Sequence, residues 1–298
     1  MADLRPLIPK QHIYNGTSHQ IVIECNPYLR RILTKIYIAN YTLQLSTETR
    51  FTSFQLFHRC LSHYIHYNII SNHHETSQGN GSVNNNNHNR YDITLLQRQE
   101  LSKLAAASIF LACKLCNEQR RIRDVINIQH VLQMQECDGI DDQTNPPALD
   151  EQYWESKRDM VNMEQTLLRV IMFDVNVCYP HRIMILLWEE NVKADKNGDA
   201  NAWKKILKAA WRSLNDSLFH VDSLMCSAPS LACASLSLAL DEVQCHDTTS
   251  NIHVLHEWWC WMDVTQKEMV EVKQKLLEAA RISKLLVPTP TFLENTGE

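Results

Sequence analysis

The stretch that decides the fold is Leu104-Ala-Ala-Ala-Ser-Ile-Phe-Leu-Ala-Cys-Lys114, which combines helical periodicity with an unusual density of small side chains. Small side chains let neighbouring helices approach closely. We therefore expect a central helix from about Leu95 to Cys116. The segment Ser230-Leu-Ala-Cys-Ala-Ser-Leu-Ser-Leu-Ala239 has a similar composition, and this weak internal repeat predicts two similar halves.

Helical periodicity recurs along the rest of the chain, whereas strand signals are sparse. The sequence therefore predicts an all-α protein of two tandem five-helix bundles. Helices are expected at about 27–43, 54–65, 95–116, 121–134 and 151–172, and then within 183–188, 203–219, 229–243 and 264–286. The predicted organisation is an N-terminal extension at 1–26, a first half at 27–178, a second half at 179–287 and a tail at 288–298.

Residues 71–90 interrupt the first half with a run of His, Asn, Ser and Gly that includes four consecutive asparagines. Such a composition buries too little apolar surface to offset the entropy of ordering the chain. We expect a disordered polar insertion here, and its asparagines indicate low complexity rather than a binding motif.

Composition excludes several classes of function. Only 6 of the 298 residues are glycine, and neither of the glycine-rich nucleotide-binding motifs occurs. The formal net charge of −5 disfavours a dominant contact with the phosphate backbone of nucleic acids. The one basic cluster noted is Arg120-Arg121-Ile-Arg123, and no basic stripe is expected elsewhere.

The ten cysteines are scattered, and the start of the chain has no apolar core of a signal peptide. We therefore expect reduced thiols in the cytosol or nucleus. The apolar run at 183–188 is far shorter than the ~20 residues that span a bilayer, so a soluble protein without a membrane contact is expected.

Two charges of opposite sign lie on otherwise apolar helix faces. Lys114 ends the stripe of the third helix, and Glu164 lies within the stripe of the fifth. Because a desolvated charge is costly unless it is paired, we expect the two to meet near the surface and to serve a protein partner. The alternative is that Lys114 extends to solvent from a helix end and that Glu164 faces a solvent gap.

Four strings, in this order and spacing, resemble the cyclin box in the transcription-type branch of the cyclin family. They are Leu111-Ala-Cys-Lys114, Arg121-Ile-Arg-Asp-Val-Ile-Asn127, Glu164-Gln-Thr-Leu-Leu-Arg-Val-Ile-Met-Phe-Asp-Val175 and Tyr179-Pro-His181. The resemblance covers roughly residues 27–285, and within the family it is to the cyclin Q subfamily, with cyclins L and K as near alternatives. Where the family has acidic residues after the lysine, this chain has Cys and Asn, with Glu118 one place further on.

The resemblance implies a regulatory subunit that binds and activates a cyclin-dependent kinase, such as the kinase partner of cyclin Q, in transcription or the cell cycle. It implies that Lys114 and Glu164 grip the regulatory helix of the kinase, and that Arg121 and Arg123 lie in a kinase-facing loop. No catalysis, cofactor, metal or direct nucleic-acid contact is expected. The expected location is the nucleus, with the cytoplasm as a second compartment.

Other chemistries have weaker sequence support. Cys113-x-x-Cys116, or His253 with His256 and Cys260, supplies too few ligands for a zinc site. Cys178 and His181 lack a third group that would orient a nucleophile and its base. A transcription adaptor that contacts DNA or other proteins, through the cluster at 120–123, stays open. The string at 29–33 is faintly similar to a substrate-docking string of cell-cycle cyclins, but an amphipathic helix explains it better.

Overall fold

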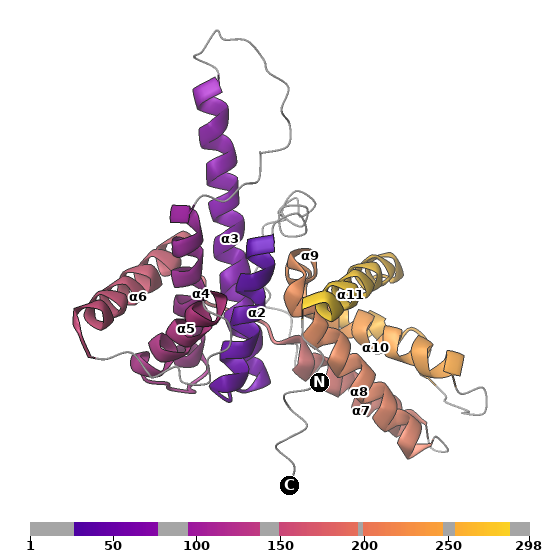
Figure 1. Ribbon diagram of the computed structural model, residues 1–298. Helices are drawn as coiled ribbons and strands as arrows, with labels where there is room; N and C mark the ends of the chain where they lie inside the picture. The colour runs from indigo at the N-terminus through magenta and orange to yellow at the C-terminus, as the bar shows by residue number, and fades with distance from the viewer. Residues whose placement is uncertain (1–26, 77–94, 138–148, 196–198, 247–253, 287–298) are drawn as a thin grey trace. The chain divides into compact units, whose positions relative to one another are not determined.

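The computed structural model describes residues 27–76, 95–137, 149–195, 199–246 and 254–286, and all regular structure within these ranges is helical (Figure 1). The described chain divides into two compact units. One runs to Tyr179 and includes the end of the last helix from Arg281, and the other comprises Pro180–Ala280. The predicted all-α class is confirmed.

The first unit contains five helices packed around the predicted central one. They are α2 (Pro27–Thr42), α3 (Thr47–Thr76), α4 (Leu95–Leu115), α5 (Ile122–Cys137) and α6 (Glu151–Val170). Helix α4 contacts each of the other four. Its alanines Ala105, Ala107 and Ala112 are buried, so the small side chains provide the close approach that the sequence predicts.

Helix α3 corrects the expected extent of the disordered insertion. It continues as a helix to Thr76, so residues 71–76 are helical. Extending an existing helix adds one hydrogen bond for each residue that is ordered, and no glycine or proline interrupts the chain before Gly79. The remainder of the predicted insertion, 77–90, lies outside the described residues.

The segment between α4 and α5 fixes the connection between α2 and α3. The Arg120 guanidinium donates to the carbonyls of Leu43 and Gln44 at 3.2 and 3.5 Å, just beyond the end of α2. The Glu118 carboxylate accepts the Ser46 N–H at 2.9 Å, at the start of α3. A cation at the carboxyl end of one helix and an anion at the amino end of the next both match the helix dipoles.

The second unit is built around α10 (Ala228–His246), which packs against α7 (Pro180–Ala194) and α8 (Ala200–Asp216). Residues 231–236 of α10 are all buried, as the internal repeat predicts. Its other α-helices are α9 (Val221–Leu224) and α11 (Gln266–Leu286), and short 3₁₀ helices occur at Ser217–Phe219 and Trp258–Met262. Helix α7 is longer at both ends than the stretch 183–188 that the sequence indicated. Within the described ranges, the search for a helix with the length and hydropathy to cross a bilayer finds none.

Candidate functional site

Lys114 and Glu164 meet, as predicted, where the end of α4 passes the middle of α6. The Lys114 ammonium donates to both carboxylate oxygens of Glu164, at 2.6 and 2.9 Å. The Lys114 side chain is 47% exposed, whereas that of Glu164 is 10% exposed. The pair therefore consists of a shielded acceptor held by a cation that remains open to solvent.

The pair retains hydrogen-bonding capacity for a partner. A lysine ammonium has three N–H donors and an ionised carboxylate has about four lone-pair sites, and the contact between Lys114 and Glu164 uses only part of each. The ammonium also lies 4.3 Å from the centroid of the Phe110 ring, one turn earlier on α4. This cation–π contact fixes the position of the ammonium without occupying its donors.

Apolar side chains adjoin Glu164 along α6. Val161 and Leu168 share its helix face, since residues three and four apart are neighbours on a helix. Val161 is 38% exposed and Leu168 is partly exposed. We call the surface formed by Phe110, Lys114, Val161, Glu164 and Leu168 the α4–α6 surface. This surface combines an ion pair with partly exposed apolar side chains on two adjacent helices.

Directly after α6, two large apolar side chains are exposed on a strained turn. Met172 and Phe173 are 81% and 67% exposed, and both have positive φ angles, of 53° and 59°. Each such angle costs about 1–2 kcal/mol for a residue other than glycine. Strain of this kind clusters at functional positions, and large exposed apolar groups favour a contact with another molecule.

Arg59 of α3 forms hydrogen bonds with this turn. Its guanidinium donates to the carbonyls of Asp174 and Asn176 at 3.2 and 3.0 Å. Burial lowers the pKa of the Arg59 guanidinium, while the neighbouring Asp174 acts in the opposite direction. The partly buried Arg59 guanidinium thus satisfies two carbonyls that follow Phe173 and stabilises the turn.

The predicted arginines separate into two groups. Arg121 and Arg123 are exposed, on either side of the start of α5, and their predicted contact with a kinase remains a prediction. Arg120, which the DNA-contact alternative needs, instead bonds to the carbonyls after α2. The cluster at 120–123 is therefore not a free basic surface along its whole length.

Among curated proteins, the chain is similar to cyclin pch1 of Schizosaccharomyces pombe, with 28% identity over 201 residues, which is 66% of this chain and 53% of pch1. It is also 28% identical to human cyclin-L1 over 195 residues, which is 65% of this chain and 34% of cyclin-L1. The chain is thus similar to members of the cyclin family. These relatives are of the transcription type, as the sequence predicted, whereas the narrower likeness to cyclin Q remains a prediction.

Solved structures share the fold of this chain. A chain of the yeast RNA Pol II CTD kinase CTDK-1 complex superposes with a TM-score of 0.62 at 12% identity, over 94% of the present chain and 76% of that chain. A chain of the CAK complex from Chaetomium thermophilum gives a TM-score of 0.51 at 12% identity, over 94% and 68% of the two chains. No family model matches the chain, which spans about half or less of the length of the curated relatives described above.

Arg59, Met172 and Phe173 were missed by the sequence-based search for site residues. The available signal was Phe173 itself, a large apolar residue that follows the end of the helical pattern and directly precedes an aspartate. Nothing in the sequence near Arg59 indicates its role, because its partners lie more than a hundred positions further along the chain.

Cys113 and Cys116, which were considered as metal ligands, take part in packing and hydrogen bonding within the first unit. Cys113 is buried, and burial raises the pKa of its thiol to about 11, which disfavours the thiolate that binds metal. Cys116 donates to Thr52 Oγ1 at 3.5 Å. No cluster of three metal-ligating side chains exists in the described part of the chain, from which His253 is missing. His181, the base considered for Cys178, is buried with its ring 4.7 Å from that of Trp211.

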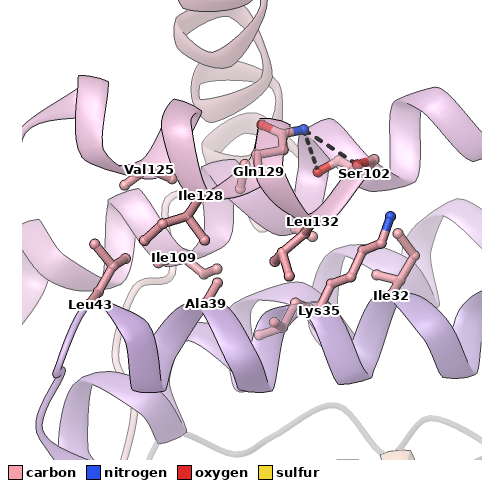
Figure 2. A pocket seen from close by; sticks show the side chains of 13 residues that line it. Ile32, Lys35, Ala39, Leu43, Ser102, Ile109, Val125, Ile128, Gln129 and Leu132 are labelled. Atoms are coloured by element: carbon pink, nitrogen blue, oxygen red, sulfur yellow. Dashed lines mark hydrogen bonds between the residues drawn. The ribbon is translucent and has the colours of Figure 1, made fainter. Parts of the chain in front are cut away.

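An apolar hollow lies between α2, α4 and α5 (Figure 2). Aliphatic side chains such as Ile32 and Ile109 line it, and at one end Gln129 donates to the carbonyl and hydroxyl of Ser102, both at 3.3 Å. Leu29, Ile32 and Leu33, from the string compared with a docking motif, are each 1% exposed. Packing in the first unit therefore accounts for the apolar residues of this string.

Proposed function

We propose that this chain is a cyclin that binds a cyclin-dependent kinase through the α4–α6 surface and activates it, with no catalysis of its own. The observation that carries the proposal is the geometry of Lys114 and Glu164, a shielded carboxylate and a half-exposed ammonium 2.6 Å apart. These are the two residues that the resemblance to cyclins assigns to the grip on the regulatory helix of a kinase. The origin of one structural neighbour in a CTD kinase complex supports the same partner class.

The pair suits the backbone of a partner helix. Free donors on Lys114 Nζ match carbonyl groups that lack partners at a helix carboxyl end, and free lone pairs on Glu164 match N–H groups at an amino end. The apolar side chains of Val161 and Phe110 would cover the adjoining part of that helix and exclude water from these bonds. Exclusion of water strengthens the hydrogen bonds, because the local dielectric constant falls.

Activation follows from differential affinity. A cyclin that binds one kinase conformation better than another shifts the kinase towards the first by the difference in binding free energy. The catalytic groups belong to the kinase in this scheme. The turn at Met172–Phe173 is a second contact in the proposal, because it exposes two large apolar side chains directly after α6.

The finer assignments are also proposals. The resemblance to cyclin Q points to the kinase partner of that subfamily, and it places Arg121 and Arg123 in the kinase-facing loop. Both arginines are exposed, as such a contact requires. A location in the nucleus fits the transcription-type relatives.

Reconstitution tests the proposal. The full chain is mixed with each member of a panel of cyclin-dependent kinases, and phosphate transfer to a generic peptide is measured with the kinase alone and the cyclin alone as controls. We expect one kinase to gain activity in proportion to the cyclin, and the cyclin alone to be inactive. Turnover by the cyclin free of kinase, or unchanged activity across the whole panel, would contradict the proposal.

A further inference from the structure

Helix α8 carries a row of cations on its exposed face. Lys204, Lys208 and Arg212 are spaced four residues apart and are all exposed. Residues at this spacing lie on one side of a helix, about 6 Å apart along its axis. We call these three residues the α8 basic row.

No carboxylate in the described part of the chain neutralises this row by an ion pair. Other lysines of the second unit are paired, as Lys193 is with Glu190 and Lys273 is with Asp241, both at 2.7 Å. Exposed faces elsewhere in the unit mix the two signs; on α11, for example, Lys267 and Glu271 are both exposed. The exposed charged residues of α8 are all cations, and Asp216, four residues after Arg212, is only partly exposed. In a chain of net charge −5 this is a local feature rather than a result of overall composition.

The row corrects the expectation that no basic stripe exists outside 120–123. In the sequence, its members are separated by Ile206, Ala210 and other residues that are buried in the structure. The helix from Ala200 to Asp216 turns these buried residues inwards and brings the three cations onto one line. The helix predicted at 203–219 already contains all three cations at this spacing, and the structure adds that all three are exposed.

The absence of large exposed apolar side chains beside the basic row on the described helix α8 indicates the class of ligand. None of the large hydrophobic residues that are exposed in the described chain lies on α8. Protein interfaces usually contain aromatic or aliphatic anchors, and membrane-binding helices insert apolar side chains. The α8 basic row lacks the exposed apolar side chains of either kind of surface. It suits a ligand that carries negative charges at regular intervals.

We propose that the α8 basic row binds the phosphodiester backbone of a nucleic acid without reading its sequence. The backbone carries a charge at every nucleotide, and binding gains free energy when the condensed counterions are released. Lysine and arginine side chains both bind phosphate oxygens. This inference depends on α8 alone, so it stands or falls independently of the proposed contact with a kinase.

The number of cations sets the salt dependence. For three contacts to a single strand, the logarithm of the association constant falls with the logarithm of salt concentration with a slope of about −2. Affinity is therefore expected to fall about twentyfold between 50 and 200 mM salt. Each removed cation is expected to reduce the magnitude of the slope by somewhat less than one.

Fluorescence anisotropy of the full chain with a labelled 20-nucleotide polyuridine RNA, and with a 20-base-pair DNA duplex, tests the proposal. The test variant replaces Lys204, Lys208 and Arg212 with glutamine. The matched control variant replaces three exposed cations on α7 and α11, namely Lys193, Lys267 and Lys284, with glutamine. Both variants have the same net charge, and thermal unfolding establishes that both are folded.

We expect the row variant to lose at least tenfold in affinity at 50 mM salt together with most of its salt slope, and the control variant to stay within threefold of the wild type. Preference for the RNA or the duplex identifies which nucleic acid is held, and either preference supports the proposal. Equal losses in both variants, or no binding to either probe at 50 mM salt, would overturn it. Binding of polyglutamate or of phosphatidylserine vesicles in place of the oligonucleotides would overturn it in favour of a protein or a membrane. Activation of a kinase by the row variant at the wild-type level would confirm that α8 acts apart from the α4–α6 surface.

Discussion

Replacing Lys114 with methionine removes the ammonium of the central ion pair and keeps an apolar stem of similar length. The Glu164 carboxylate, 10% exposed, would then lose its partner in the described structure. Leaving a shielded acceptor unsatisfied costs about 1–3 kcal/mol of folding stability. Glu164→Gln instead leaves a lysine that is 47% exposed, so its cost is expected to stay below about 1 kcal/mol.

Binding is expected to respond differently from stability. If the pair grips the kinase, each single substitution should weaken kinase binding by about 2–5 kcal/mol, which is roughly 30-fold to several thousandfold in Kd. The double variant should lose less than the sum of the two, since both groups act on one shared contact. Its stability should lie closer to the wild type than that of Lys114→Met, because no shielded charge is left alone.

The assay combines isothermal titration of the kinase with thermal unfolding, on the wild type, the two single variants and the double variant. Lys103 and Asp159 supply a matched control, because they form a second ion pair between α4 and α6, at 2.9 Å, away from the α4–α6 surface. Lys103→Met and Asp159→Asn should alter stability slightly and leave kinase affinity unchanged. Unchanged affinity in Lys114→Met or Glu164→Gln, or equal losses in the control pair, would refute the reasoning.

Three further outcomes are expected. Arg59→Ala removes the donors that bind the turn after α6 and should lower the free energy of unfolding by about 1–2 kcal/mol, measured in urea. An unchanged urea midpoint would show that Arg59 does not stabilise the turn. Burial acts to raise the pKa of Glu118, but hydrogen bonds from the start of α3 outweigh it and hold that pKa below its usual range. The stability that Glu118 contributes is therefore present above its unfolded pKa of about 4.3 and is lost as the pH falls through the lower folded value. Glu118→Gln should therefore reduce the loss of folding stability at acid pH. A pH dependence parallel to that of the wild type would count against the hydrogen bond between Glu118 and the start of α3. Burial raises the pKa of the Cys233 thiol to about 12, whereas Cys178 is exposed. Iodoacetamide at pH 8 should therefore alkylate Cys178 before Cys233, as followed by mass spectrometry. Alkylation of Cys233 before Cys178 would contradict the fold around α10.

The sequence alone determined the helical class and the central helices. Periodicity and side-chain size are local properties, and the alanines of α4 are readable without knowledge of what packs against them. The contact between Lys114 and Glu164 was also predictable, because a charge on an apolar helix face is costly unless an opposite charge pairs with it. Local patterns of this kind carry over from sequence to structure.

Helix limits were less predictable. The polar composition after residue 71 indicated disorder, yet α3 continues to Thr76 because a helix that is already nucleated extends at little cost. The stretch 183–188 indicated a short helix, whereas α7 extends from Pro180 to Ala194. Composition indicates the conformation of a segment in isolation. It does not include the effect of the helix to which the segment is joined.

Only the tertiary structure decided which exposed groups act together. Arg59 reaches the turn after Phe173 across more than a hundred residues of chain, and no local pattern records such a distance. Arg120 belongs to a basic cluster in the sequence but bonds to the carbonyls after α2. Lys204, Lys208 and Arg212 have helical spacing in the sequence, but only the structure shows that all three are exposed. The physical reason is that a charge is assigned to solvent, to a helix end or to a partner by what surrounds it in space, and those surroundings come from distant parts of the chain.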